Sequence, residues 1–413
     1  MDVKPFRGVR PPRELAARVQ GRAYDVMNSE EAAVECAGNP MSILHITRPE
    51  INFTPLIDEH EERVYLTARK QYDFFRQSGW LIRDSKPCYY VYAQTMEGRT
   101  QYGLVVTASV SDYREGRIKR HELTRKAKED DRKRHIETIG AQIGPAFLVY
   151  RHQDELRKLI REVVKEEPEY DFLAPEDQTT HRLWVIRNDS DISRITSIFS
   201  NIPALYIADG HHRTAASARC GADYFLAVCF PDDELRILDY NRLVRDLNGL
   251  TPEELLSRLA EDFEIENETL RYEDENENET LDANRHRPRG LHEFALYMAG
   301  KWYRLNLRSG RCNEKDPIGR LDTDICSRLI LARQLGITDL RTDPRVDFVG
   351  GLRGLGELER RVDSGEMALA IALYPVSMTQ IMDIADSGNI MPPKSTWFEP
   401  KLRSGLVINE YAS

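Results

Sequence analysis

The chain contains 413 residues, of which 41% are hydrophobic and 31% are charged, and this mixture is typical of a soluble globular protein. Its length exceeds the size at which one hydrophobic core stops growing, so about two domains are expected. The net charge of −10 argues against general affinity for nucleic acid, and no stretch approaches the roughly 20 apolar residues of a membrane helix.

The six cysteines are widely scattered and include no Cys-x-x-Cys pair. This spacing predicts reduced, mostly buried thiols and argues against a disulfide framework or a zinc site. Residues 1–5 lack the apolar segment of a signal peptide. A cytoplasmic protein that does not enter a membrane is therefore expected.

The first half of the chain alternates helical and strand patterns. Apolar residues at helical spacing over 57–78 predict a helix that stops at Gly79, and Ser29 is a good N-cap for a helix reaching residue 37. Further predictions are extended or turn structure over the first thirty residues, helices at 154–165 and 191–199, strands at 43–47, 146–150 and 181–186, and a hairpin of strands 86–94 and 101–109.

The second half begins with a helix start in which Thr251 is the N-cap, Pro252 the first position and Glu254 the third. Residues 261–282 hold eleven acidic residues and one arginine, and the stretch 272–284 has so little to bury that we expect a mobile loop. Further predictions are strands at 224–230, 237–240, 346–349 and 367–374, a hairpin of strands 291–298 and 301–307, and helices at 322–335, 357–362 and 377–385.

Hairpins mixed with strand–helix units indicate an α+β, or mixed α/β, fold. The turn at Asn248-Gly249 suggests a boundary between two domains. We therefore expect one domain over residues 1–248, a second α/β domain with the acidic loop over 249–390, and a tail over 391–413 whose prolines exclude helix at its start.

The densest group of reactive side chains lies in a turn between a strand pattern and a run of small, helix-favouring residues. A helix start offers free backbone N–H groups to an anion, an arginine matches phosphate oxygens, and a histidine can transfer protons. An aspartate there could hold Mg²⁺ or fix a histidine tautomer, or simply cap the helix while the histidines stay solvated. The turn reads Asp209-Gly210-His211-His212-Arg213.

A second candidate is the charged segment 119–135, which has eight Lys or Arg against four Asp or Glu. If helical, it would place Glu122, Arg125, Glu129 and Arg132 on one face, with His121, Lys128 and His135 on a neighbouring face. Such a helix either lines a cleft for an anionic ligand or forms a solvated face crossed by ion pairs.

A third candidate is the glycine-rich run 350–356 between a strand and a helix. It matches neither the Walker loop nor the dinucleotide fingerprint, so a tight strand–helix connection is the favoured interpretation over a phosphate cradle. The five histidines that stand alone in the sequence are expected to be structural; they are His45, His152, His181, His286 and His292.

Several motifs together resemble a conserved prokaryotic family of unknown function that carries an Ala-Asp-Gly-His-His-Arg motif. The match extends over nearly the whole chain. It rests on Phe6-Arg7-Gly8, Lys119-Arg120-His121-Glu122-Leu123-Thr124-Arg125, Ala208-Asp209-Gly210-His211-His212-Arg213, Leu238-Asp239-Tyr240-Asn241-Arg242 and Met391-Pro392-Pro393-Lys394-Ser395-Thr396.

The Asp-Gly-His-His-Arg turn also resembles the signature of the ParB/sulfiredoxin superfamily, which includes free serine kinases. This resemblance implies a ParB/sulfiredoxin-like core in which the turn binds the phosphates of a donor together with Mg²⁺ while an acidic residue activates the serine. His211 stands where sulfiredoxins need a cysteine and where ParB nucleotidases have glutamate, so neither of those chemistries is expected.

We therefore expect a cytoplasmic phosphotransferase acting on a small-molecule hydroxyl, with free L-serine as one acceptor and ATP, ADP or pyrophosphate with Mg²⁺ as donor. Glu122, His211 and His212 are the predicted catalytic residues, Asp209 is the predicted metal ligand, and Asp25 and Glu50 are further candidates for the base. The predicted phosphate-binding residues are Asp209, Gly210, Arg213, Lys119, His121, Thr124, Arg125, Lys128 and Arg132.

Two alternatives remain open at this point. One is a nucleotide-binding regulatory protein without turnover, and the other is a ParB-like nuclease, which only the basic segment favours. The sequence leaves the oligomeric state open, a homodimer included.

Overall fold

The computed structural model describes residues 1–268 and 282–411, and its contacts divide the chain into two compact units. Unit 1 comprises Met1–Leu235 and Pro400–Ser413, and unit 2 comprises Arg236–Glu399. The division falls before the turn at Asn248-Gly249 because β14 (Tyr240–Val244) pairs with two strands of unit 2. The last residues of the chain belong to unit 1.

Unit 1 is built on a sheet of mixed direction in which the order is β6-β11-β8-β12-β5-β4-β10-β9, with β1 pairing on β5. Most neighbours are antiparallel, but β12 runs parallel to β8 and β11 runs parallel to β6. The strands are β1 (Val3–Lys4), β4 (Tyr89–Met96), β5 (Arg99–Ser109), β6 (Ile118–Lys119), β8 (Ala146–Tyr150), β9 (Tyr170–Ala174), β10 (Thr179–Ile186), β11 (Leu205–Asp209) and β12 (Tyr224–Pro231).

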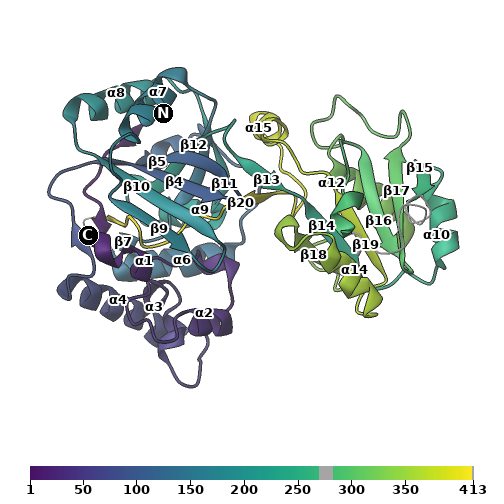
Figure 1. The fold of residues 1–413 in the computed structure, drawn as a ribbon, viewed down its shortest axis with the longest axis horizontal. Coiled ribbons are helices and arrows are strands. Elements are labelled where there is room, and N and C mark those ends of the chain that lie inside the picture. The colour runs from purple at the N-terminus through teal and green to yellow at the C-terminus, as the bar shows by residue number, and fades with distance from the viewer. Residues whose placement is uncertain (269–281, 412–413) are drawn as a thin grey trace. The chain divides into compact units, whose positions relative to one another are not determined.

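One face of this sheet is covered by α7 (Asp154–Val163) and α8 (Asp189–Ser200) (Figure 1). Alternate residues of the central strands point to these helices, as the period of two in a strand requires. The core between them includes Leu104, Leu148, Leu159, Phe199 and Ala227.

The other side of the sheet carries the remaining helices of the unit, with α9 against α6 and α6 against α4. These helices are α1 (Ala16–Val19), α2 (Ser29–Glu35), α3 (Leu44–Thr47), α4 (Glu62–Gln77), α6 (Lys126–Ile139) and α9 (His211–Ser217), while α5 (Val110–Arg114) follows β5. Two small ribbons, β2 (Val9–Arg10) with β3 (Ile82–Arg83) and β7 (Ala141–Gln142) with β21 (Asn409–Glu410), complete the unit.

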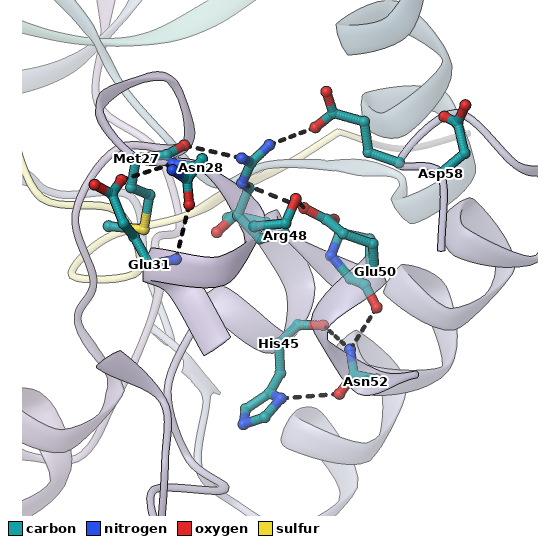
Figure 2. A network of polar contacts seen from close by, with 12 residues as sticks. Met27, Asn28, Glu31, His45, Arg48, Glu50, Asn52 and Asp58 are labelled. Atoms are coloured by element: carbon teal, nitrogen blue, oxygen red, sulfur yellow. Dashed lines mark hydrogen bonds and ion pairs between the residues drawn. The ribbon is translucent and has the colours of Figure 1, made fainter. Parts of the chain in front are cut away.

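A network of hydrogen bonds and ion pairs connects the residues around α2 and α3 (Figure 2). Arg48, directly after α3, donates to the carbonyl of Met27 at 2.8 Å and pairs with Glu50 at 3.3 Å and with Glu59. Asn28 caps α2 in a capping box with Glu31. Because α2 begins at Ser29, the N-cap predicted at Ser29 is wrong by one position.

Unit 2 contains a fully antiparallel sheet in the order β15-β17-β16-β19-β14-β18. One face packs on α10 and the helical segment from α12 to α13, and the other packs on α14. The strands are β14, β15 (Phe263–Asn267), β16 (Glu293–Met298), β17 (Lys301–Leu307), β18 (Val346–Gly350) and β19 (Leu369–Leu373), and β13 (Arg236–Leu238) pairs with β20 (Trp397–Glu399).

Three helical elements of unit 2 follow one another without a break. They are α12 (Asp322–Ile325), a π-helical stretch (Cys326–Ala332) and α13 (Arg333–Leu335). The others are α10 (Pro252–Leu259), α14 (Gly356–Asp363) and α15 (Met378–Asp386). The predicted capping boxes at Thr251 and Ser377 are both present.

The structure confirms a mixed α/β protein and most of the predicted elements, including both hairpins. The strand predicted at 43–47 is wrong, since Leu44–Thr47 form helix α3, and the first thirty residues include the short helix α1 where extended or turn structure was predicted. Most of the predicted acidic loop, 269–281, lies outside the described residues. Within the described part of the chain, every helix is too short or too polar to traverse a bilayer.

Candidate functional site

The turn from β11 into α9 has the conformation that only glycine accepts readily. Gly210 is the N-cap of α9 with φ of +83°, and a Cβ there would lie 3.1 Å from the guanidinium of Arg213. The N-cap of α9 is Gly210 and not Asp209, whose carboxylate contacts Arg213 and Lys401. The simpler interpretation of the turn, in which Asp209 caps the helix, is therefore not what the structure shows.

Asp209 is held between two cations. Its Oδ2 accepts from Arg213 Nη2 at 2.7 Å, and its Oδ1 lies 3.4 Å from Lys401 Nζ. Burial favours a higher pKa for Asp209, but the charges of Lys401 and Arg213 outweigh burial and hold the pKa below its ordinary value. The carboxylate is thus permanently ionised at neutral pH.

Arg213 is buried beside the Asp209 carboxylate and contacts residues from three segments of the chain. Its side chain is 8% exposed, it donates from Nη1 to the carbonyl of Pro145 at 2.5 Å, and Asp25 lies 3.8 Å from Nη2. Nε of Arg213 has no hydrogen-bond partner among the described residues. Nε is therefore a buried donor that the described residues leave unsatisfied.

His211 is the most buried reactive side chain of the turn, with 5% of its surface exposed. Its ring packs edge-on against that of His121 at 4.6 Å between centroids, and its Nδ1 lies 3.7 Å from Glu122 Oε2. Its Nε2 finds no hydrogen-bond partner in the described part of the chain. Unpartnered buried nitrogens of this kind are uncommon, so this atom points to a ligand or to water.

Both histidines of this pair are neutral at physiological pH. Burial lowers the pKa of His211 to about 4, with the neighbouring Asp209 acting in the opposite direction. Burial also lowers the pKa of His121 to about 3, and His211 lowers it further. A neutral ring donates a hydrogen bond from one nitrogen and accepts at the other.

His212 ties the segment before α6 to α9, because its Nε2 accepts from the backbone N–H of Arg125 at 3.1 Å. In the same segment the hydroxyl of Thr124 donates to Glu129 of α6. Burial, followed by the charge of Lys128, lowers the pKa of His212. His212 and Thr124 therefore shape this segment through contacts within the protein.

The charged segment is a helix only from Lys126 onward, so the predicted face shared by Glu122, Arg125, Glu129 and Arg132 is wrong. The chain leaves β6 at Lys119, which lies opposite Tyr206 of β11, and reaches α6 through a non-helical stretch. That stretch brings Glu122 to His211, a contact that a continuous helix would not make.

The predicted phosphate-binding cations end in different surroundings. Arg132 is 8% exposed, lies 4.0 Å from the centroid of the Tyr24 ring and pairs with Asp131. Lys128 is exposed on α6 and close enough to influence His212. Arg125 is exposed at the N-cap of α6. The structure therefore brings Lys128 close to His212, whereas the guanidinium of Arg132 is already paired with Asp131.

Sequence reasoning missed Lys401, which returns to the turn from the end of the chain. No pattern in the sequence marks this lysine, since 192 positions separate it from Asp209.

Of the further candidates for the base, Asp25 is at the site, 3.8 Å from Arg213. Glu50 is 1% exposed and bound to Arg48 and Ser29, so it is unavailable to a substrate (Figure 2).

A cavity of about 40 Å³ in unit 1 adjoins these residues and is large enough for a few water molecules. Its polar lining includes Tyr24, Arg132, His135, Gln142 and Arg213. Gln142 Nε2 also lacks a partner among the described residues. The cavity is too small for a nucleotide, so any such ligand would bind on the open side of the turn.

These residues fit a phosphate better than they fit Mg²⁺. His211 Nε2 and Arg213 Nε are buried nitrogens without a hydrogen-bond partner among the described residues, and Arg213, Lys401 and Lys128 supply positive charge. Asp209 is a poor ligand for Mg²⁺ because both of its oxygens face cations. Binding of a metal by Asp209, as predicted from the sequence, would require Arg213 or Lys401 to move aside.

The glycine-rich run of unit 2 is closely packed by its own unit. A Cβ at Gly350 would lie 2.8 Å from the Trp397 ring, and one at Gly351 would lie 2.2 Å from Asp239 Oδ1. The carbonyl of Gly351 accepts from Arg287 at 3.1 Å. These contacts favour the tight strand–helix connection over the phosphate cradle.

Comparison with solved structures finds partial likeness at low identity. A free serine kinase in complex with AMP has a TM-score of 0.36 at 16% identity, with 73% of this chain and 92% of that chain covered. A conserved hypothetical protein from Pyrococcus furiosus has a TM-score of 0.33 at 14% identity, covering 71% and 90%. SbnI with a C-terminal truncation, from Staphylococcus aureus, has a TM-score of 0.35 at 11% identity, covering 72% and 84%.

Comparison with curated proteins finds no match. Residues 3–324 match a family described as "Protein of unknown function (DUF1015)". That match covers well over half of the sequence and includes the whole of the turn from β11 to α9. The chain therefore belongs to the DUF1015 family.

Proposed function

We propose that this protein is a phosphotransferase that acts on a small-molecule hydroxyl, with free L-serine as the leading acceptor. The donor is a nucleoside phosphate, ATP or ADP, or pyrophosphate, which arrives as its Mg²⁺ complex. We further propose that unit 1 is a ParB/sulfiredoxin-like core. The observation that carries the proposal is the buried, unpartnered Nε2 of His211 beside Arg213 and Glu122.

Phosphate binding follows from the donors that the turn leaves open. The neutral ring of His211 donates from Nε2 to a phosphoryl oxygen, and Arg213 offers Nε from a buried guanidinium that Asp209 already orients. Lys401 and Lys128 add positive charge that stabilises the phosphoryl oxygens as the transfer proceeds. Because contacts with Asp209 hold Arg213 and Lys401, little reorganisation of these two groups accompanies binding.

Glu122 is the proposed acceptor of the hydroxyl proton. In the transfer, the hydroxyl oxygen forms a bond to the terminal phosphorus, the bond from that phosphorus to the bridging oxygen breaks, and the proton passes to the Glu122 carboxylate. The shortened nucleotide or inorganic phosphate leaves with the electron pair of the broken bond. With Nε2 protonated, His211 Nδ1 is an acceptor 3.7 Å from Glu122, so it can share the proton after a small rotation.

The test is incubation of the pure protein with L-serine, Mg²⁺ and each of the three donors, followed by detection of phosphoserine by mass spectrometry. We expect product with at least one donor, a loss of about 10²-fold or more in His211→Ala and Glu122→Gln, and no change in His60→Ala. His60 is a suitable control because its side chain is 60% exposed in unit 1. Absence of product with every donor, together with no nucleotide-induced thermal shift, would refute the proposal.

The second candidate is a nucleotide-binding regulatory protein without turnover. One observation favours this candidate. Both oxygens of Asp209 lie next to cations, Arg213 and Lys401, so this carboxylate has no oxygen left to hold Mg²⁺. This candidate predicts a thermal shift with nucleotide that His211→Ala removes, without phosphoserine under any condition. The same pair of assays therefore separates the two candidates.

A further inference from the structure

Outside the turn, a histidine, a cysteine and a glutamate come together in unit 2. His292 directly precedes β16, whereas Cys312 and Glu314 lie in the segment between β17 and α12. One ligand atom from each residue lies within 4.8 Å of the other two. Sequence spacing gave no sign of this group, because His292 lies in a different segment from Cys312 and Glu314.

The three ligand atoms lie close enough together to surround one metal ion. Cys312 Sγ lies 3.1 Å from Glu314 Oε1, and His292 Nδ1 lies 3.6 Å from the same oxygen. Zn²⁺ bound at about 2.0–2.3 Å by nitrogen, oxygen and sulfur places its ligands roughly 3.3–3.6 Å apart. Only small movements of the side chains would complete such a site.

The orientation of His292 is the second observation that points to a cation. Its Nε2 lies 3.1 Å from the carbonyl of Arg320, which can only accept, so the proton of the neutral ring resides on Nε2. In that form of the ring Nδ1 carries a lone pair, and it lies 3.6 Å from Glu314 Oε1. A ring N–H bound to a backbone carbonyl is the usual support of a histidine that ligates a metal.

The backbone of His292 is also fixed. Its N–H donates to both oxygens of the buried Asp322, at 2.9 and 3.1 Å, and this carboxylate lies at the start of α12. The ring therefore stays in place without help from a metal. Glu314, with a side chain 68% exposed, leaves the group open to ions from solvent.

We propose that His292 Nδ1, Cys312 Sγ and Glu314 Oε1 form a Zn²⁺ site, with water as the fourth ligand. On binding, the S–H bond of Cys312 breaks, its proton passes to solvent, and the thiolate donates an electron pair to the metal, so no oxidant or reductant is involved. The metal links the start of β16 to the segment before α12. The site is separate from the proposed phosphotransfer and does not depend on it.

The test uses the full-length protein after treatment with a chelator. Zn²⁺ is titrated by calorimetry and Co²⁺ by absorption spectroscopy, and we expect about one equivalent of each and a thiolate-to-cobalt charge-transfer band. Cys312→Ser abolishes the band and weakens Zn²⁺ binding at least about tenfold, and Glu314→Gln weakens it to a similar degree. Cys220→Ser, a thiol of similar partial exposure in unit 1, changes neither.

Two results would overturn the site: no stoichiometric Zn²⁺ binding by the wild type, or equal affinity in the wild type and Cys312→Ser. The alternative is an ion pair between a protonated His292 and Glu314, which predicts both of these results. Circular dichroism of each metal-free variant shows that it is folded, and the exposed Glu314→Gln keeps the test decisive if Cys312→Ser loses structure.

Discussion

Replacing Asp209 with asparagine tests whether its carboxylate holds the buried Arg213 in place. The substitution keeps an oxygen that accepts from Arg213 Nη2 but removes the charge, leaving Asp25, at 3.8 Å, as the remaining carboxylate near that guanidinium among the described residues. Breaking a fully buried ion pair costs about 3–5 kcal/mol, and an exposed pair about 0.2–1 kcal/mol. With side chains 8% and 30% exposed, this pair lies between the two, so we expect a loss of about 1–3 kcal/mol at pH 7.

The difference in stability between wild type and Asp209→Asn should depend on pH, in a direction set by the lowered pKa of Asp209. The pKa of Asp209 in the folded state is lowered, so the stability that it contributes is fully present above the unfolded pKa of about 4 and is lost as the pH falls toward the folded pKa. At pH 3 the unfolded state binds the proton while the folded state does not, which removes about 1.4 kcal/mol. The difference between wild type and Asp209→Asn should shrink by that amount.

The assay is urea unfolding between pH 3 and pH 7, with hydrogen–deuterium exchange to assign the change to unit 1 of this two-unit chain. Asp223→Asn is the matched control, because Asp223 is exposed at the surface of the same unit. A difference below about 0.5 kcal/mol at pH 7, or one that stays constant down to pH 3, would refute this view of the Asp209–Arg213 pair.

Three further predictions concern the same site. Lys401→Met should weaken nucleotide binding about tenfold in calorimetry, because it removes one positive charge beside Asp209; unchanged affinity would place Lys401 outside the phosphate site. Gly210→Ala should destabilise unit 1 by more than Gly221→Ala, because both have positive φ but only the Cβ at 210 meets Arg213; equal melting temperatures would contradict this. The rate of phosphotransfer should show no inflection from His211 between pH 6 and 8, since its pKa is lowered to about 4; an inflection near 6.5 that vanishes in His211→Gln would show that the ring is charged.

The fold class and most of the secondary structure follow from local patterns in the sequence. The capping boxes at Thr251 and Ser377 and the hairpin of β4 and β5 are short-range features, and the structure contains them. The strand expected at 43–47 fails because Ile43 and Ile46 pack in the core against α4 as part of a short helical segment, and so short an apolar stretch fits either state.

The turn from Asp209 to Arg213 could be found from the sequence because its reactive residues are adjacent. The residues that surround it could not, since they arrive through the tertiary fold. Glu122 reaches His211 only because the chain before Lys126 is not helical, and Lys401 reaches Asp209 from the C-terminal end. The group of His292, Cys312 and Glu314 also forms only in the tertiary fold. The scattered spacing of the cysteines had argued against a zinc site, because spacing along the chain does not show which residues lie next to Cys312.

The central claim, that the turn binds phosphate through His211, can be measured directly by NMR of protein labelled with ¹⁵N in its histidines. We expect the Nε2 resonance of His211, assigned through His211→Gln, to shift on addition of ADP or pyrophosphate as this nitrogen gains an acceptor. His60, which is exposed, should stay unchanged. If saturating nucleotide shifted other histidines but left His211 unmoved, the ligand would bind elsewhere and the proposed phosphate site would be wrong.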